Sequence, residues 1–143
     1  MVRSDLRLVR PEGWETRLLE AIEAHEARPF VWGRDDCLTF ALACARAMVP
    51  ELEVEDLPAY DDERSAARVL AKRKWRDVGD ALASAFEEVH PAFAHRGDLG
   101  VIKGEEAAAA VVFVGPYVVG MDKPGGLRHV PRPLATRAFR VSL

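Results

Sequence analysis

The stretch PFVWGRDDCLTFALACARAM, residues 29–48, decides how the rest of the chain is interpreted. Its first half holds aromatic residues, a glycine and two aspartates, a composition typical of a loop. Its second half, from Cys37 onward, is an apolar run typical of a buried helix. We expect Asp35 or Asp36 to cap this helix, because aspartate oxygens accept hydrogen bonds from the free N–H groups of a first turn. The stretch therefore places a cysteine at the start of a core helix.

Cys37 permits two interpretations. The free N–H groups and the dipole at a helix start favour a thiolate, which suits a nucleophile. However, Cys37 shares a helical stripe with Phe40 and Cys44, and free cysteine is among the residues most often buried. The neighbouring aspartates also oppose a thiolate, because a nearby negative charge raises the pKa of a thiol. The spacing alone leaves both a catalytic and a purely structural Cys37 open.

The order of the expected elements predicts the fold class. A chain of 143 residues is expected to form one domain, residues 1–143. The pattern predicts a helical part over about 12–90, with helices at 12–27, 37–48, 62–74 and 77–89. From about 98 to 143 it predicts valine-rich strands, at 98–102, 107–115, 117–121, 126–131 and 137–143. Helices followed by strands indicate an α+β fold, with N-terminal helices packed on a C-terminal antiparallel sheet.

Composition argues against several classes of partner. A net charge of -3 gives little attraction for phosphate backbones, so we expect no nucleic-acid partner. Charges interrupt the apolar residues of the N-terminal segment, and the longest apolar run, residues 107–114, is too short to span a bilayer. We therefore expect no signal peptide and no membrane insertion. The cysteine and histidine spacings fit no metal pattern, and no phosphate-binding loop is seen, so no metal or other cofactor is expected.

Two motifs resemble a known family. The Trp32-Gly33 turn followed by Asp36-Cys37 resembles the nucleophile element of the NlpC-type papain-like cell-wall peptidases. The segment HRGDLGVI, residues 95–102, resembles the Gly-Asp-Leu segment that opens the first strand of the sheet in that family. The pattern is also similar to a diverged branch of that superfamily, found as small proteins in the tail modules of tailed phages and prophages. The resemblance implies a papain-like NlpC-type fold.

The resemblance also implies roles for particular residues. Cys37 takes the place of the nucleophile, and four residues take places that form the binding site: Trp32, Gly33, Asp36 and Asp98. In active members of the family, a histidine at the start of the second strand deprotonates the cysteine. Here Ala107–Ala110 occupy that segment. His129 is then the remaining candidate base and Asp122 the candidate orienting residue, although His129 equally fits a partly exposed strand position.

Two functions follow as expectations. The first is a tail-tip or assembly component of a phage or prophage, with a degenerate catalytic site and other tail proteins as partners. Such a protein would be located in the virion tail, or in the host cytoplasm during assembly. The alternative is an active cysteine peptidase or amidase, with Cys37 attacking a peptidoglycan peptide and backbone N–H groups stabilising the oxyanion. We favour the first, because losing the base removes catalysis without removing the fold.

Overall fold

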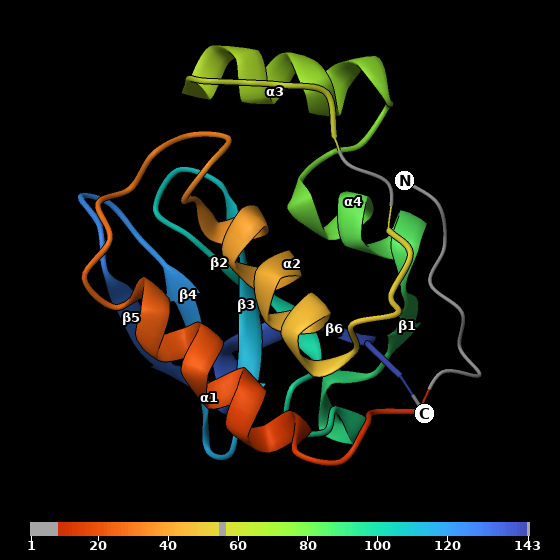
Figure 1. Cartoon of the computed structure of the whole chain (residues 1–143). Helices are drawn as coiled ribbons and strands as arrows, with labels where there is room; N and C mark the ends of the chain where they lie inside the picture. The colour runs from red at the N-terminus through yellow and green to blue at the C-terminus, as the bar shows by residue number, and fades with distance from the viewer. Residues whose placement is uncertain (1–8, 55–56, 143) are drawn as a thin grey trace.

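The computed structural model describes residues 9–54 and 57–142, which form an α+β fold (Figure 1). The helices are α1 (Trp14–His25), α2 (Cys37–Met48), α3 (Glu63–Lys72) and α4 (Val78–Ala85). The strands are β1 (Glu87–Val89), β2 (Leu99–Lys103), β3 (Ala108–Val114), β4 (Tyr117–Met121), β5 (Leu127–Pro131) and β6 (Ala135–Arg140). Two short 3-10 helices are η1 (Pro91–Phe93) and η2 (Arg132–Leu134). The predicted α+β class, with helices on an antiparallel sheet, is confirmed.

The strands form a single antiparallel sheet. Their order is β1-β6-β2-β3-β4-β5, so β2 to β5 follow one another and β6 returns to lie between β2 and β1. Gly115 has φ 68° in the two-residue turn between β3 and β4, a conformation that glycine adopts without a steric penalty. Short connections of this kind explain why the strands were recognisable as separate valine-rich segments.

Helix α2 forms the centre of the core. It packs against β3 and β4 on one face of the sheet, with α1 beside it (Figure 1). Phe40, Ala41, Cys44 and Met48 have no exposed surface, as expected for the most apolar helix of the chain. The buried partners of α2 include Leu18, Leu99, Ala110, Val112, Val119 and Phe139. A smaller cluster lies on the other face, with Val111, Phe113, Val118, Val130 and Ala138.

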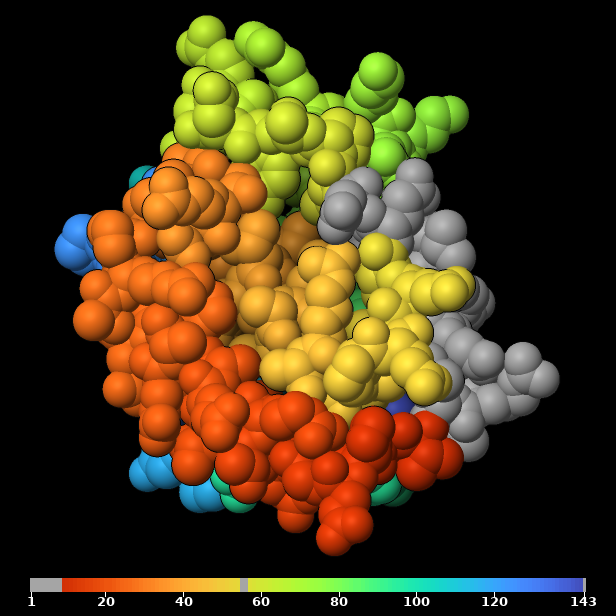
Figure 2. All heavy atoms as spheres, viewed as in Figure 1, coloured from red at the N-terminus to blue at the C-terminus, as the bar shows by residue number. Residues whose placement is uncertain are grey.

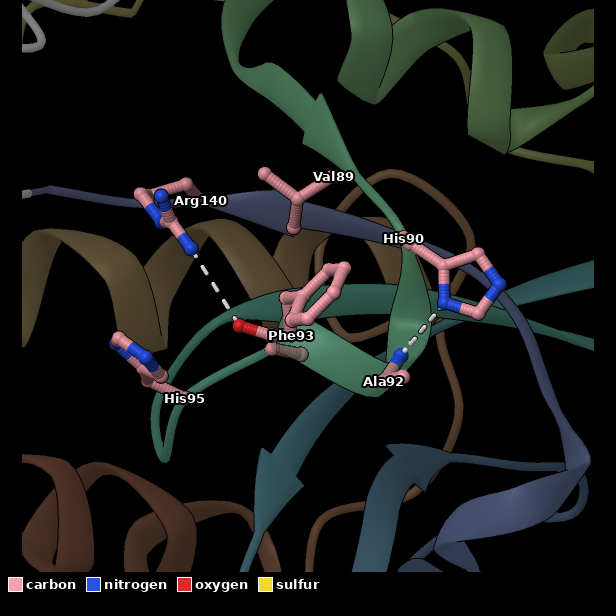
Figure 3. A pocket seen from close by; sticks show the side chains of 7 residues that line it. Val89, His90, Ala92, Phe93, His95 and Arg140 are labelled. Atoms are coloured by element: carbon pink, nitrogen blue, oxygen red, sulfur yellow. Dashed lines mark hydrogen bonds between the residues drawn. The ribbon is translucent and has the colours of Figure 1, made fainter.

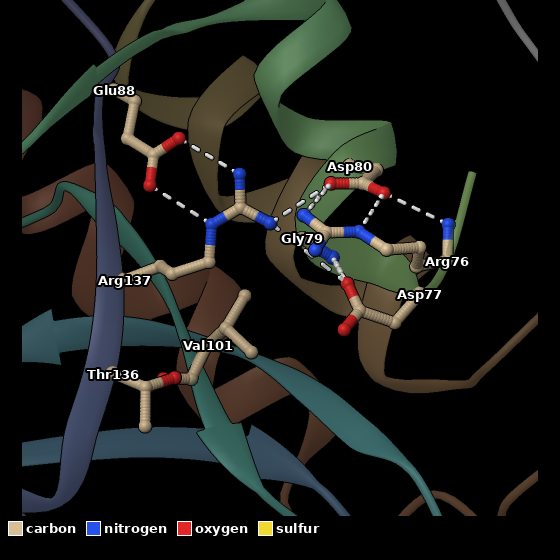
Figure 4. A network of polar contacts seen from close by, with 8 residues as sticks. All are labelled: Arg76, Asp77, Gly79, Asp80, Glu88, Val101, Thr136 and Arg137. Carbon is tan, nitrogen blue, oxygen red and sulfur yellow. Dashed lines mark hydrogen bonds and ion pairs between the residues drawn. The ribbon is translucent and has the colours of Figure 1, made fainter.

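One predicted helix is wrong in its last four residues, 86–89. The pattern predicts a helix over 77–89, but α4 ends at Ala85 and the following residues form β1 beside β6. The backbone of β1 pairs with β6, and side-chain contacts of Arg137 on β6 accompany this pairing. Its Nε and Nη2 donate to the two Glu88 oxygens at 2.9 and 2.8 Å, and its Nη1 donates to Asp80 at 3.1 Å (Figure 4). Such long-range pairing overrides a local helical pattern. The last strand is also misplaced, since β6 is Ala135–Arg140 and not 137–143.

Helix α3 stands apart from this core. It is capped by Asp62, whose side chain accepts from the N–H of Ser65, and none of its residues is buried. Figure 2 shows α3 and the segment that follows it projecting from the body of the molecule. Across the described segments, no helix combines the length and apolar character that crossing a membrane requires.

Candidate functional site

The start of α2 is fixed by a capping box. The Asp36 carboxylate accepts from the Thr39 N–H at 2.9 Å, and the Thr39 hydroxyl accepts from the Asp36 N–H at 2.9 Å. Of the two aspartates that the sequence left open, Asp36 is therefore the N-cap. Asp35 has a different role, because its carboxylate pairs with Arg28 at 3.1 Å. Cys37 becomes the first residue of the helix.

The turn before Cys37 is held by the same carboxylate. The N–H of Gly33 donates to Asp36 at 2.8 Å, and the Tyr60 hydroxyl donates to the same oxygen at 2.6 Å. Gly33 has φ 80°, and a side chain there would overlap the Tyr60 carbonyl oxygen. The Trp32-Gly33 turn thus needs its glycine. Tyr60 was missed from the sequence, because it lies 24 residues beyond Asp36 in a loop with no signal that connects the two.

The Cys37 thiol is poorly suited to ionise. The residue is half-buried, and both cysteines are free. Burial raises the pKa of the Cys37 thiol to about 11, and the Asp36 charge acts in the same direction. The backbone of Ala110, on β3, hydrogen-bonds toward the sulfur and opposes this rise in pKa. Of the segment Ala107–Ala110, Ala110 therefore reaches the thiol, and it offers the sulfur a main-chain group.

A cleft of about 320 Å³ opens beside Cys37. It lies between the loop before α2, the start of α3, and the turns that follow β2 and β4. Its lining includes Phe30, Trp32, Cys37, Glu63, Glu105, Glu106, Ala107, Ala108, Ala109, Ala110, Asp122, Lys123 and Arg128, and it includes no histidine. The cleft therefore combines aromatic and charged side chains but lacks the imidazole that a cysteine peptidase needs as a general base.

The two candidates for the rest of a triad are separated by the fold. Asp122 lines the cleft at the end of β4, where its carboxylate pairs with Arg128 at 3.5 Å. His129 lies exposed on β5, with its ring centre 6.5 Å from that of Tyr117, and it is not among the residues that line the cleft. The structure thus brings Asp122, and not His129, to the same cleft as Cys37.

The other three histidines occupy structural positions. His25 is buried on α1, with its Nδ1 2.6 Å from the Ala21 carbonyl oxygen and its ring against Phe40. His90 and His95 line a separate open depression, together with Phe93 (Figure 3). The His90 Nδ1 accepts from the Ala92 N–H at 3.0 Å and so caps η1. None of the three is placed beside the Cys37 cleft.

Asp98 lies at the opposite end of α2, where Gly97 approaches the Met48 side chain. Asp98 is fully buried and accepts from the backbone N–H groups of His95 and Val141 at 2.8 and 3.2 Å. It also pairs with Arg10 at 3.0 Å. Burial lowers the pKa of the Arg10 guanidinium, and the Asp98 charge opposes that decrease. The predicted site residue Asp98 therefore joins three chain segments and does not line the cleft.

The fold and the site together define an α+β protein with a half-buried cysteine at the start of its core helix and a histidine-free cleft beside it. Within residues 9–54 and 57–142, no three metal-binding side chains converge on one point. Residues 9–141 match the family described as "Domain of unknown function (DUF6950)", so the chain belongs to this family. The curated proteins give no sequence match.

Proposed function

We propose that this protein is a tail-tip or assembly component of a phage or prophage tail, with an NlpC-like papain-type fold and a degenerate catalytic site. The observation that carries the proposal is the environment of Cys37: alanine backbone lies against the thiol, and no histidine lines the cleft. Such a site keeps the packing of a peptidase while lacking its base. Its cleft and surfaces remain free to contact neighbouring proteins.

The raised thiol pKa supports a non-catalytic role. Nucleophilic attack by cysteine requires the thiolate. With a pKa of about 11, only ~1 thiol in 10,000 is ionised at neutral pH. A papain-like site normally overcomes this problem with an adjacent imidazole, which takes the proton and leaves an ion pair. Here Asp36 adds negative charge beside the sulfur, which works against the thiolate.

The tail context rests on the resemblance described above. Its motifs are the Trp32-Gly33 turn with Asp36-Cys37 and the Gly97-Asp98 segment before β2. The proposed partners are other tail proteins. To test this, particles would be purified from the organism that carries the gene and their proteins identified by mass spectrometry. Peptides of this protein at a fixed ratio to the tail proteins would support the proposal. Tail-bearing particles that lack the protein, together with normal tails in cells from which its gene is deleted, would contradict it.

An active cysteine peptidase is the second candidate, and one observation favours it. Cys37 is the first residue of α2, where main-chain N–H groups lie close to the sulfur, as stabilising an oxyanion requires. Purified wild type and Cys37→Ala would be incubated with muropeptides. Cleavage by the wild type that Cys37→Ala abolishes would establish the peptidase and overturn the degenerate site. The degenerate-site proposal predicts identical, background-level hydrolysis for both.

A further inference from the structure

The aromatic side of the Cys37 cleft forms a fixed corner. Phe30 and Trp32 meet edge to face, with ring centres 5.0 Å apart, and both line the cleft. Their loop is tied to the turn after β4, because the Phe30 N–H donates to the Pro124 carbonyl at 3.1 Å and Pro29 bridges Gly125. The corner is therefore held in place by backbone contacts on both sides of the cleft.

A cation already occupies this corner. The Lys123 ammonium lies 4.8 Å from the centre of the Trp32 ring and 5.6 Å from that of Phe30. A cation over an aromatic face is attracted by the negative charge of the ring faces. Among the described residues, Lys123 forms no ion pair with a carboxylate. The two rings are thus the groups that attract the Lys123 ammonium. Because a cation–π contact is weaker than a buried ion pair, another cation can replace Lys123.

The rim of the cleft carries an excess of negative charge. Glu63, Glu105 and Glu106 line it without a cationic partner among the described residues, whereas Asp122 is paired with Arg128. Four carboxylates therefore surround the cleft against two basic side chains. An excess of this kind favours a positively charged ligand and disfavours an anionic one.

Trp32 differs from the other two tryptophans because it lines the cleft. Trp14 carries Arg10 at 4.4 Å from its ring centre, and Trp75 carries Arg73 at 5.3 Å. Neither ring lines the cleft, and Arg10 is already fixed by Asp98. Of these three cation-tryptophan pairs, the Trp32 pair is the one beside the cleft, which a ligand can enter.

We infer that the cleft binds a lysine or arginine side chain of a partner polypeptide, and that Lys123 holds this place in the unbound protein. The inference rests on the binding role proposed above and names the chemistry of the partner. The aromatic corner receives the cation, the glutamates surround it, and the volume of about 320 Å³ admits a side chain rather than a folded domain. Cys37 lines the same cleft, but it takes no chemical part.

The test is a titration followed by the indole N–H signals in proton–nitrogen NMR spectra. The chain has three tryptophans, so Trp14 and Trp75 serve as internal controls for Trp32. N-acetyl-lysine methylamide is the probe. Its norleucine analogue lacks the charge, and its glutamate analogue reverses it. We expect a saturable shift of the Trp32 signal alone, with the lysine probe binding at least fivefold more tightly than norleucine. Equal affinities, tighter binding of glutamate, or no saturable shift with the lysine probe would overturn the inference.

Two variants make the test sharper. Lys123→Met keeps most of the aliphatic chain but removes the ammonium group from the Phe30 and Trp32 rings. The variant should therefore bind the lysine probe severalfold more tightly. If Lys123 instead bound a ligand carboxylate, this variant would lose affinity for the glutamate probe. The double variant Glu105→Gln/Glu106→Gln should weaken lysine binding about threefold or more. The matched control Glu51→Gln/Glu53→Gln, at exposed positions outside the cleft, should leave it unchanged. A failed titration would not restore the missing base, whereas muropeptide cleavage would overturn the degenerate site whatever the titration shows.

Discussion

The two ends of α2 carry two aspartates that the sequence singled out, and the fold uses them differently. At the N-terminal end, Asp36 is also buried, and among the described residues its carboxylate accepts from neutral donors only: two backbone N–H groups and the Tyr60 hydroxyl. It stands beside a half-buried thiol and an open cleft. At the other end, Asp98 is fully buried and its charge is matched by Arg10. One end therefore has a carboxylate that is matched by a guanidinium. The other end has a carboxylate without a cationic partner within residues 9–54 and 57–142, and it lies beside a thiol that borders the cleft.

The two ends of α2 contribute differently to stability and to chemistry. The contacts of Asp98 stabilise the fold, because they connect the segments that contain Arg10, His95 and Val141. The end with Cys37 has the turn, the cap and the cleft, and burial together with the Asp36 charge raises the pKa of its thiol. Substitutions should therefore affect stability most at the Asp98 end and reactivity most at the Asp36 end.

The largest expected effect is that of Asp98→Ala. It removes the partner of a guanidinium that is only 9% exposed and leaves the His95 and Val141 N–H groups unpaired. Breaking a buried pair of this kind destabilises a protein by about 3 to 5 kcal/mol. The free energy of unfolding would be measured by urea denaturation. Asp98→Asn keeps one oxygen acceptor and should cost less. A loss below about 1 kcal/mol for Asp98→Ala would remove the distinction between the two ends.

A smaller effect is expected for Asp36→Ala. The variant loses the helix cap, worth about 1 to 2 kcal/mol, and leaves Gly33 and Tyr60 without their acceptor. We expect a decrease of about 2 kcal/mol in the free energy of unfolding, below that of Asp98→Ala. Tyr60→Phe, which removes one hydrogen bond, should lose about 1 kcal/mol. If Asp36→Ala lowered the free energy of unfolding more than Asp98→Ala does, the N-terminal end of α2 would contribute more to stability than the Asp98 end, which would contradict this account.

The smallest effect on stability, with a clear chemical effect, is expected for Asp36→Asn. The asparagine oxygen can still cap α2, but its NH2 group then faces the Gly33 N–H in place of an acceptor. The free energy of unfolding should therefore fall by about 1 kcal/mol, less than in Asp36→Ala. The variant removes the negative charge beside Cys37, and the pKa of the thiol should fall. The pH midpoint of thiol alkylation would show this decrease. Glu51→Gln, which removes an exposed charge elsewhere, is the control and should leave the midpoint unchanged. An unchanged midpoint in Asp36→Asn would mean that burial alone sets the thiol pKa.

The sequence predicted those parts of the molecule that short-range patterns determine. The apolar run from Cys37 defined α2, and the aspartates before it defined the cap. The glycine after Trp32 marked a turn that requires a positive φ. Valine-rich segments between glycines and prolines marked the strands from β2 to β5. These features depend on residues within one turn or one hairpin, so a local pattern suffices to detect them.

Features that depend on distant residues were missed. The local pattern predicts a helix where β1 forms, because β1 is defined by its pairing with β6, about 50 residues further along the chain. Tyr60 reaches Asp36 from a separate loop, and Lys123 reaches Trp32 from the turn after β4. No local pattern in the sequence indicates that these residues are in contact. The alanine run Ala107–Ala110 is plain in the sequence, but only the fold shows that Ala110 lies against the sulfur of Cys37.

The main prediction is that the Cys37 thiol stays protonated at neutral pH. Its most direct test is the pH dependence of Cys37 alkylation by iodoacetamide. Short pulses are used, and circular dichroism checks that the chain stays folded at each pH. Peptide mass spectrometry separates Cys37 from Cys44, whose side chain is fully buried. Because the pKa of Cys37 is raised, the thiol keeps its proton through neutral pH and ionises only above the ordinary value of 9.0. We predict slow alkylation near pH 7 and a midpoint of about 11. A midpoint below about 8 would reveal a stabilised thiolate and contradict the account.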